Sequence, residues 1–335
     1  MTLARDRTVQ GLTIALGVML IVSALVPSWI VNQMLFGFAR AIAVIGLMVL
    51  WRTRLVSFGH ALYFGLGAYT VAMLNRYTGL TDAFLLIGAA AAATTLLGFL
   101  IGFIVRRYRD IFFAMLNLAF SMILYGILVK TEALGSTDGF TIEQPTFAGI
   151  AFEDASEGKL ALLCVLLVIG WAVAVGVQAY LRSTLGRLTT AIGDNEIRVE
   201  YLGYSAEKAI HIKYVLSTFL AGIGGGFMAL ALGQVDPDSM VNWTASGELV
   251  FVTILSGPGS VAAPFIGSFV FEILRTYAFE WMPHAWQMIV GGTLLAIIFF
   301  MPGGLWSLVA RIAGRFGAGG AAGAPAAPSA RKAEG

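Results

Sequence analysis

The sequence predicts an all-α, polytopic membrane protein, a bundle of about ten membrane-spanning helices. Composition, long apolar segments and the distribution of basic residues support this prediction. Hydrophobic residues make up 58% of the 335-residue chain, charged residues only 12%, and the mean hydropathy is +0.84. Soluble domains carry about 25% charged residues. Because too few polar groups remain to cover the surface of a water-soluble globule, the composition excludes a cytosolic enzyme, a secreted domain and a disordered protein.

Apolar segments account for the spans in order along the chain. A helix needs roughly 20 apolar residues to cross the hydrocarbon. The segments that qualify are 12–31, 34–51, 55–75, 83–105, 111–129, 160–181, 214–235, 249–271 and 281–301. Glycine and proline interrupt one of them at Gly257-Pro258-Gly259. Dividing the segment there gives about ten crossings, one of them short.

The two ends of the chain complete this division. Two arginines precede the first apolar segment, but no cleavage signal of small residues follows, so we expect an uncleaved first helix. Residues 1–313 are predicted to form the transmembrane domain. Residues 314–335 consist largely of Gly, Ala, Pro and Ser. Because they cannot bury enough apolar surface to fold, we expect a disordered tail.

Basic residues in the short loops predict the orientation of the bundle. Lysine and arginine are enriched on the cytoplasmic side of membrane proteins. With the N-terminus inside, the inner side receives most of the basic residues, and an even number of crossings keeps the basic C-terminal region there. We therefore expect both termini in the cytoplasm. The long acidic loop 131–158 is then periplasmic, and the long loop 182–208, which contains both signs of charge, is cytoplasmic.

Motifs for catalysis and for metal binding are missing from the sequence. It contains no GxxxxGK[ST] phosphate loop, no HExxH pair and no GxSxG elbow. The single cysteine, Cys164, and three distant histidines offer no metal site. The net charge of +2 does not suggest nucleic-acid binding. We therefore expect no enzyme activity, no catalytic residues, no metal and no cofactor in this chain.

Three charged residues are predicted to lie in the membrane, Arg40 within a span and Glu272 and Arg275 directly after the segment 249–271. Glu272 and Arg275 are three positions apart and can pair with each other on one helix. Arg40 can extend toward the membrane surface or bond to a neighbouring helix. A transporter driven by protons or sodium usually keeps more ionisable groups at the midplane. The small number of such groups here counts against a transporter of that kind. An ATP-independent secondary transporter or channel remains the alternative function.

Polar residues in two of the spans are candidates for a solute path. Ser57, His60 and Tyr63 lie in a glycine-rich span, and Asn117 and Ser121 are about one helical turn apart. An asparagine in hydrocarbon costs free energy unless it is paired, so these groups should face protein or water. Two interpretations remain open, hydrogen bonding between helices and lining of a translocation path.

The inner loop contains one predicted amphipathic helix, capped by Thr189 or Thr190 and ended by Gly203. Its polar side is acidic, whereas docking on a membrane surface favours Lys and Arg. The other option is a groove on a cytoplasmic protein. The residues predicted to make this contact are Ile192, Asp194, Asn195, Glu196, Glu200, Leu202 and Gly203. Among them, Ile192 and Leu202 are the apolar anchors, and the two glutamates would meet basic groups of the partner.

Five segments, in order, carry a resemblance to one family. The stretch 186–204 resembles the coupling loop of LivM-type permeases of branched-chain amino acid ABC importers. The other segments resemble further motifs of that family: LVSFGHALYFGLGAYT at 55–70, IFFAMLNLAFSMILYG at 111–126, GSTDGF at 135–140 and SGELVFVTILSGPGSVAAPFIGSFVFEIL at 246–274. The sequence departs from the family pattern at Gly193, where a basic residue is usual, and at Asn117, where a small hydroxyl residue is usual.

The resemblance implies a multi-pass permease of the bacterial inner membrane that forms half of a translocation path. It implies three kinds of protein partner besides the lipid bilayer: a second homologous permease, two ATP-binding cassette ATPases and a periplasmic substrate-binding protein. ATP and Mg would then be bound, and ATP hydrolysed, by the ATPases. The implied substrates are branched-chain amino acids, with urea, amides and aromatic carboxylates as alternatives within the family.

Overall fold

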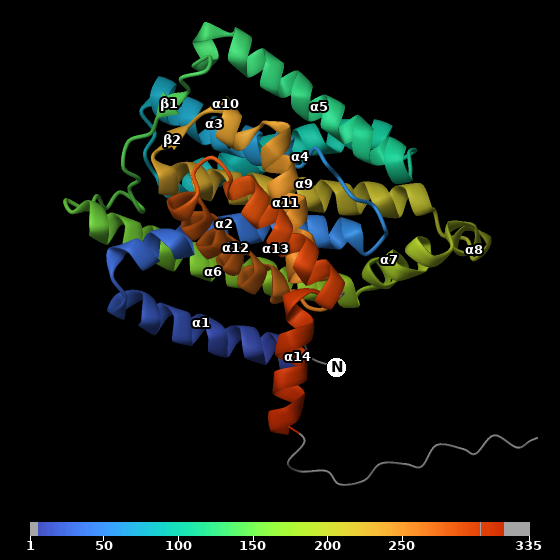
Figure 1. Ribbon diagram of the computed structural model, residues 1–335. Helices are drawn as coiled ribbons and strands as arrows, with labels where there is room; N and C mark the ends of the chain where they lie inside the picture. The colour runs from blue at the N-terminus through green and yellow to red at the C-terminus, as the bar shows by residue number, and fades with distance from the viewer. Residues whose placement is uncertain (1–5, 302, 318–335) are drawn as a thin grey trace, which may run out of the picture.

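Helix α9 (Ala206–Leu232) lies at the centre of the fold (Figure 1). The computed structural model describes residues 6–301 and 303–317. The helices with the most extensive contacts to α9 are α2 (Ser28–Trp51), α3 (Ala61–Thr78) and α4 (Ala83–Val105). Every residue of α9 from Gly222 to Ala231 is buried. This part of the chain is therefore a protein core rather than a lipid-facing surface.

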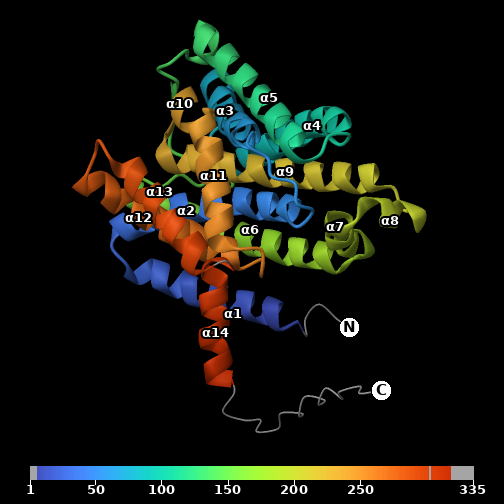
Figure 2. The ribbon, with the colours of Figure 1, turned by 45° about the vertical axis from the view of Figure 1, so that its right-hand side comes forward.

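The remaining long helices surround this core (Figure 2). Helix α6 (Ala155–Arg182) packs on α2, and α1 (Arg7–Leu25) packs mainly on α6, so α1 is largely exposed. Helix α5 (Asp110–Lys130) lies on the side of the fold opposite α1, and most of its residues are not buried. The last part of the bundle contains α11 (Trp243–Ser256), α12 (Ala263–Trp281) and α13 (Trp286–Phe300), of which α11 and α12 pack against α2.

Each predicted span corresponds to helical structure, and the chain is a multi-pass helical membrane protein. Six helices of the described residues are long and apolar enough to cross a membrane, namely α1, α2, α4, α5, α6 and α9. Helix α13 is apolar but shorter. Helices α3, α11 and α12 would supply the other crossings, so the number of about ten and the topology stay predictions.

Several helix boundaries differ from the predicted segments. The first helix ends at Leu25 instead of residue 31, because Pro27 disfavours helical geometry at the preceding residue and caps the start of α2. The break at Gly257, by contrast, agrees with the sequence, and this residue has a φ of +81° that favours glycine. Helix α12 then starts at Ala263 and continues to Trp281, well beyond the predicted end of that segment.

Glycines let the central helices approach one another closely. A Cβ atom on Gly225 would overlap the carbonyl oxygen of Phe64 in α3, and one on Gly222 would overlap the hydroxyl of Thr94 in α4. A Cβ on Gly224 would lie 2.6 Å from the carbonyl oxygen of Ala39 in α2. The glycine run of α9 is therefore a packing surface for three neighbours, as small residues commonly are between membrane helices.

The two long loops lie at opposite ends of the bundle (Figure 1). One end carries η2 (Glu132–Leu134), α10 (Pro237–Met240) and the antiparallel strands β1 (Phe140–Thr141) and β2 (Gln234–Val235). The other end carries α7 (Thr184–Asp194) and α8 (Glu196–Tyr201), which extend beyond the long helices. This separation agrees with loops on two different sides of a membrane.

Helix α14 (Gly304–Gly317) leaves the bundle sideways (Figure 2). It includes residues 314–317, which we predicted to belong to a disordered tail. Apolar residues at Leu305, Leu308 and Val309 recur with helical spacing, and the helix they begin continues past the composition change. The rest of the predicted tail, 318–335, lies outside the described residues.

Candidate functional site

The five candidate path residues lie together in the interior of the chain. Ser57 and His60 precede α3, Tyr63 lies in its first turn, and Asn117 and Ser121 lie in α5. Each of these residues is 0% exposed. The sequence therefore predicted correctly that these polar groups avoid lipid. In the structure each of them is surrounded by other parts of the chain.

Helix α9 supplies the partners that join three of these residues. His60 Nε2 lies 2.6 Å from Ser217 Oγ. The hydroxyl of Tyr63 lies 2.8 Å from that of Tyr214, which donates a hydrogen bond to Asn117 Oδ1. Asn117 Nδ2 in turn donates to the carbonyl oxygen of Phe113 at 2.7 Å. We define the interior network as His60, Tyr63, Asn117, Tyr214 and Ser217.

Ser57 and Ser121 lie outside this network. Ser57 Oγ accepts from the backbone N–H of Gly59 at 3.4 Å, and Ser121 Oγ donates to the carbonyl oxygen of Val241 at 3.1 Å. In this conformation four of the five candidate residues make hydrogen bonds to another segment, whereas the bond of Ser57 is local. Lining of a translocation path requires access for the solute and therefore stays a prediction.

Sequence reasoning missed the α9 partners, Tyr214 and Ser217. On the same helix, the side chain of Lys213 is fully buried, and its Nζ has no hydrogen-bond partner within the described residues. Lys213 and Ser217 are four positions apart and share one helix face. Polar residues at this spacing in an otherwise apolar helix were the signal that could have identified this face.

The charged residues within the spans pair differently from the prediction. Glu272 binds Arg40 of α2, with Nη1 and Oε2 2.5 Å apart, rather than Arg275 on its own helix. Arg40 Nη2 also lies 3.4 Å from Glu248 Oε2, and Arg275 Nη1 lies 3.8 Å from the same oxygen. The guanidinium of Arg40 stacks over the ring of Phe271 at 5.3 Å. This charge cluster therefore joins three helices, α2, α11 and α12.

The inner loop forms two short helices instead of one. Asn195 adopts an extended conformation that ends α7, and its Oδ1 accepts a hydrogen bond from the N–H of Arg198 at 2.9 Å to start α8. The cap of α7 is Ser183, whereas Thr189 and Thr190 lie inside that helix. Asparagine favours helix caps over helix interiors, which explains the division.

The predicted coupling residues have different environments. Ile192 is only 6% exposed and packs within the chain, so it cannot serve as the predicted anchor for a partner in this conformation. Leu202 is 71% exposed and remains available. Asp194 pairs with Arg54 at 3.3 Å, and both side chains are exposed. Glu200 is exposed, and Gly203 has a φ of +86°, which suits its position after the helix.

Four exposed apolar side chains lie on α8 and directly after it. They were not predicted as a unit, although they belong to the motif of the inner loop. The exposed side chains are Ile197, Tyr201, Leu202 and Tyr204. We call these four residues the α8 apolar face. Exposed apolar groups concentrated at the tip of a protruding segment are typical of a protein contact.

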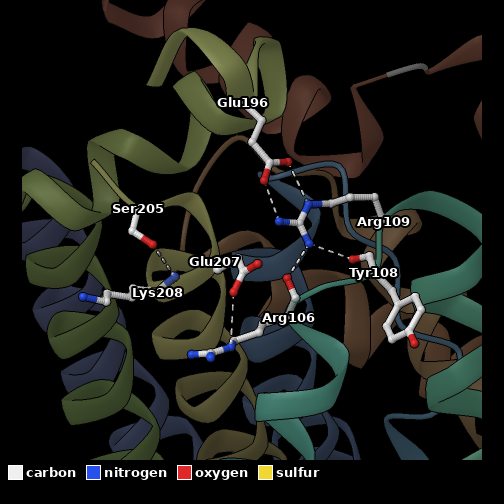
Figure 3. A network of polar contacts seen from close by, with 7 residues as sticks. All are labelled: Arg106, Tyr108, Arg109, Glu196, Ser205, Glu207 and Lys208. Carbon is white, nitrogen blue, oxygen red and sulfur yellow. Dashed lines mark hydrogen bonds and ion pairs between the residues drawn. The ribbon is translucent and has the colours of Figure 1, made fainter. Parts of the chain in front are cut away.

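Glu196 binds within the chain (Figure 3). The Arg109 guanidinium donates two hydrogen bonds to its carboxylate, Nε to Oε2 at 2.7 Å and Nη2 to Oε1 at 2.5 Å. Arg106 Nε lies 3.6 Å from Glu207 Oε2 in the same region. Glu196 was predicted to meet basic groups of a partner, but its carboxylate is engaged by Arg109 in this conformation.

Comparisons with known proteins agree with the resemblance found in the sequence. A sequence model of the family described as "Branched-chain amino acid transport system / permease component" matches residues 29–299. The chain is 27% identical over 281 residues to the "High-affinity branched-chain amino acid transport system permease protein LivM" of Escherichia coli (strain K12), and equally to that of Salmonella typhimurium. Each alignment covers 77% of this chain and 65% of the relative.

A second kind of relative is more distant. The "Autoinducer 2 import system permease protein LsrC" of Klebsiella pneumoniae is 25% identical over 181 residues, which cover 51% of this chain and 48% of the relative. The chain thus spans slightly less than two thirds of the two LivM relatives and about half of this one. A comparison with solved structures found no match.

Proposed function

The chain belongs to the family of branched-chain amino acid transport system permease components, and from this premise we propose that it is the membrane permease subunit of an ATP-driven ABC importer. It would form half of the translocation path in the bacterial inner membrane. The partners would be a second homologous permease, two ATP-binding cassette ATPases, which bind ATP and Mg, and a periplasmic binding protein. Branched-chain amino acids are the substrates that the names of the LivM relatives support.

The α8 apolar face is the observation that carries this proposal. Tyr201 is 88% exposed and Leu202 is 71% exposed, at the tip of a segment that extends beyond the bundle. Burying such side chains in a groove of a cytoplasmic protein is favourable, because each large apolar side chain contributes about 1.5–3 kcal/mol when it leaves water. We assign the ATPase subunit as the protein that supplies this groove. Leu202, Gly203 and the exposed Glu200 keep the coupling role predicted for them.

Reconstitution tests the proposed function directly. We expect the purified chain alone to show no ATP hydrolysis and no uptake of leucine, isoleucine or valine into proteoliposomes, because its sequence lacks a phosphate-binding loop. Together with the permease, ATPases and binding protein of adjacent genes, it should support ATP-dependent uptake. Uptake of labelled solute is the measurement, with urea and an aromatic carboxylate as further substrates.

One outcome of that experiment would contradict the proposal. Uptake by the single chain along an ion or solute gradient would support the secondary transporter or channel. A variant that lacks the α8 apolar face tests the ATPase contact itself. Tyr201→Asp with Leu202→Asp should abolish binding of the ATPases. Unchanged co-purification of the ATPases with this variant would remove α8 from the contact.

Labelling of single cysteines should establish the topology. In a Cys164→Ala background, we expect Ile150→Cys to react with a membrane-impermeant maleimide added to spheroplasts and Tyr201→Cys to react only after lysis. Both positions are exposed, at 63% and 88%, and lie at opposite ends of the bundle. The basic residues near α8 favour the cytoplasmic assignment of that end. The reverse labelling pattern would invert the orientation.

A further inference from the structure

Helix α8 has few attachments to the rest of the chain. Val199 is its one buried residue within the described structure. Arg198 and Glu200 are exposed, and Ile197 and Tyr201 belong to the α8 apolar face. Glu196, with 29% of its side chain exposed, is therefore the charged residue through which α8 is held to the bundle.

The partner of Glu196 is held firmly at the start of α5. Besides its two bonds to the carboxylate, Arg109 Nη1 donates to the carbonyl oxygens of Arg106, at 2.5 Å, and Tyr108, at 2.9 Å (Figure 3). Arg109 is the residue that precedes the first turn of α5. Such a paired, charge-assisted contact fixes both distance and direction between two groups. A displacement of α8 is thereby imposed on the beginning of α5.

Helix α5 leads from this contact to the interior network. The buried residues of α5 are Phe113, Asn117, Ser121 and Leu128. Asn117 accepts the hydrogen bond of Tyr214, two helical turns from Arg109. The other residues of α5 are half-buried or exposed, and α5 contacts the rest of the chain less extensively than the core helices do, so a small movement of α5 disturbs few contacts within the chain. The pair of Arg106 with Glu207 holds the preceding loop to the first turn of α9, which provides a fixed reference.

We propose that the Arg109–Glu196 pair is the mechanical link by which movement of α8 reaches α5 and the interior network. The proposal rests on the proposed function, since it assumes that a partner moves α8. It assigns to Glu196 a positioning role inside the permease in place of a direct contact with the ATPase. Arg109, which no motif singled out, becomes a coupling residue. The α8 apolar face receives the movement, and the ion pair transmits it.

Reversal and exchange of the two charges test the link in the reconstituted complex. We expect Arg109→Glu and Glu196→Arg each to leave assembly intact but to lower the stimulation of ATP hydrolysis by loaded binding protein, and uptake, on the order of tenfold. The double variant, with the charges exchanged, should recover a large part of both. Arg107→Glu is the matched control, because Arg107 lies in the same loop, is exposed and makes no ion pair within the described residues.

A second measurement needs no partner. In the permease alone, Glu196→Gln should raise hydrogen exchange of the backbone amides in the first turns of α5, with a smaller effect on α9. Normal stimulation in both single variants, or unchanged exchange in α5, would overturn the link. If the wild-type complex itself shows no ATP-dependent uptake, the proposed function fails instead, and the exchange measurement still decides whether α8 and α5 are joined.

Discussion

Replacement of Gly225 by alanine is expected to prevent accumulation of the folded permease. The new Cβ would overlap the carbonyl oxygen of Phe64, which is a backbone atom and cannot rotate away. Relief of the overlap requires α3 and α9 to separate, and both helices are buried against other helices at this depth. Overpacking of a core costs about 1–3 kcal/mol and often more. We expect the upper part of that range or beyond, measured as a lost monodisperse peak and a lower melting temperature in detergent.

Gly126→Ala is the matched control for this prediction. Gly126 lies about one turn before the end of α5, and a Cβ built there meets no atom within 4 Å. Alanine favours a helix over glycine by about 1 kcal/mol, so the control should be neutral or slightly more stable than the wild type. A Gly225→Ala protein that purifies and melts like the wild type would show that α3 and α9 do not approach as closely as described.

Arg40→Met should be the second change with a large effect. The substitution leaves two carboxylates, Glu272 and Glu248, close together with side chains only 7% and 18% exposed. Removing one partner of a buried ion pair costs about 3–5 kcal/mol, because the remaining charge stays in a medium of low polarity. We expect a marked fall in melting temperature and in the yield of folded protein, measured in the same detergent as the wild type.

Two further variants separate charge burial from loss of packing. Arg40→Met with Glu272→Met removes both members of the closest pair, and a well-packed apolar replacement is often tolerated. This double variant should be more stable than Arg40→Met alone. Arg275→Met affects a longer contact with a side chain that is 36% exposed, so a change within about 1 kcal/mol is expected. Equal losses in all three variants would mean that the paired charges are not what stabilises this cluster.

Hydropathy predicted most of the helices because a span must be apolar over its whole length. The same property hid the boundary at Pro27, since the residues on both sides of the proline are apolar and a hydropathy window does not register a backbone restraint. Pairing of Arg40 with Glu272 was beyond the reach of sequence reasoning. The two residues are 232 positions apart, and nothing in either segment specifies its neighbour.

The candidate sites could be predicted only in part, and the reasons are similar. Polarity within the spans identified His60, Tyr63 and Asn117, but their partners on α9 lie in a different predicted span, 214–235, and nothing in the sequence links the two segments. In the inner loop, alternation of apolar and polar residues predicted a helix without showing which face points outward. Ile192 therefore looked like an anchor, although it packs inward, and Tyr201 was overlooked although it is the more exposed residue.

The position of α1 has a consequence for how this architecture diversifies. Helix α1 lies on α6 at the periphery, and a Cβ added at Gly11 or Gly17 would meet no atom within 4 Å. The region shared with the family begins at residue 29, just after the first residue of α2. A larger side chain at either of these two positions therefore meets no steric obstacle within the described residues, whereas most glycines of α9 accept none without overlap. The first helix can therefore change in sequence with less effect on packing than the glycine-packed centre can.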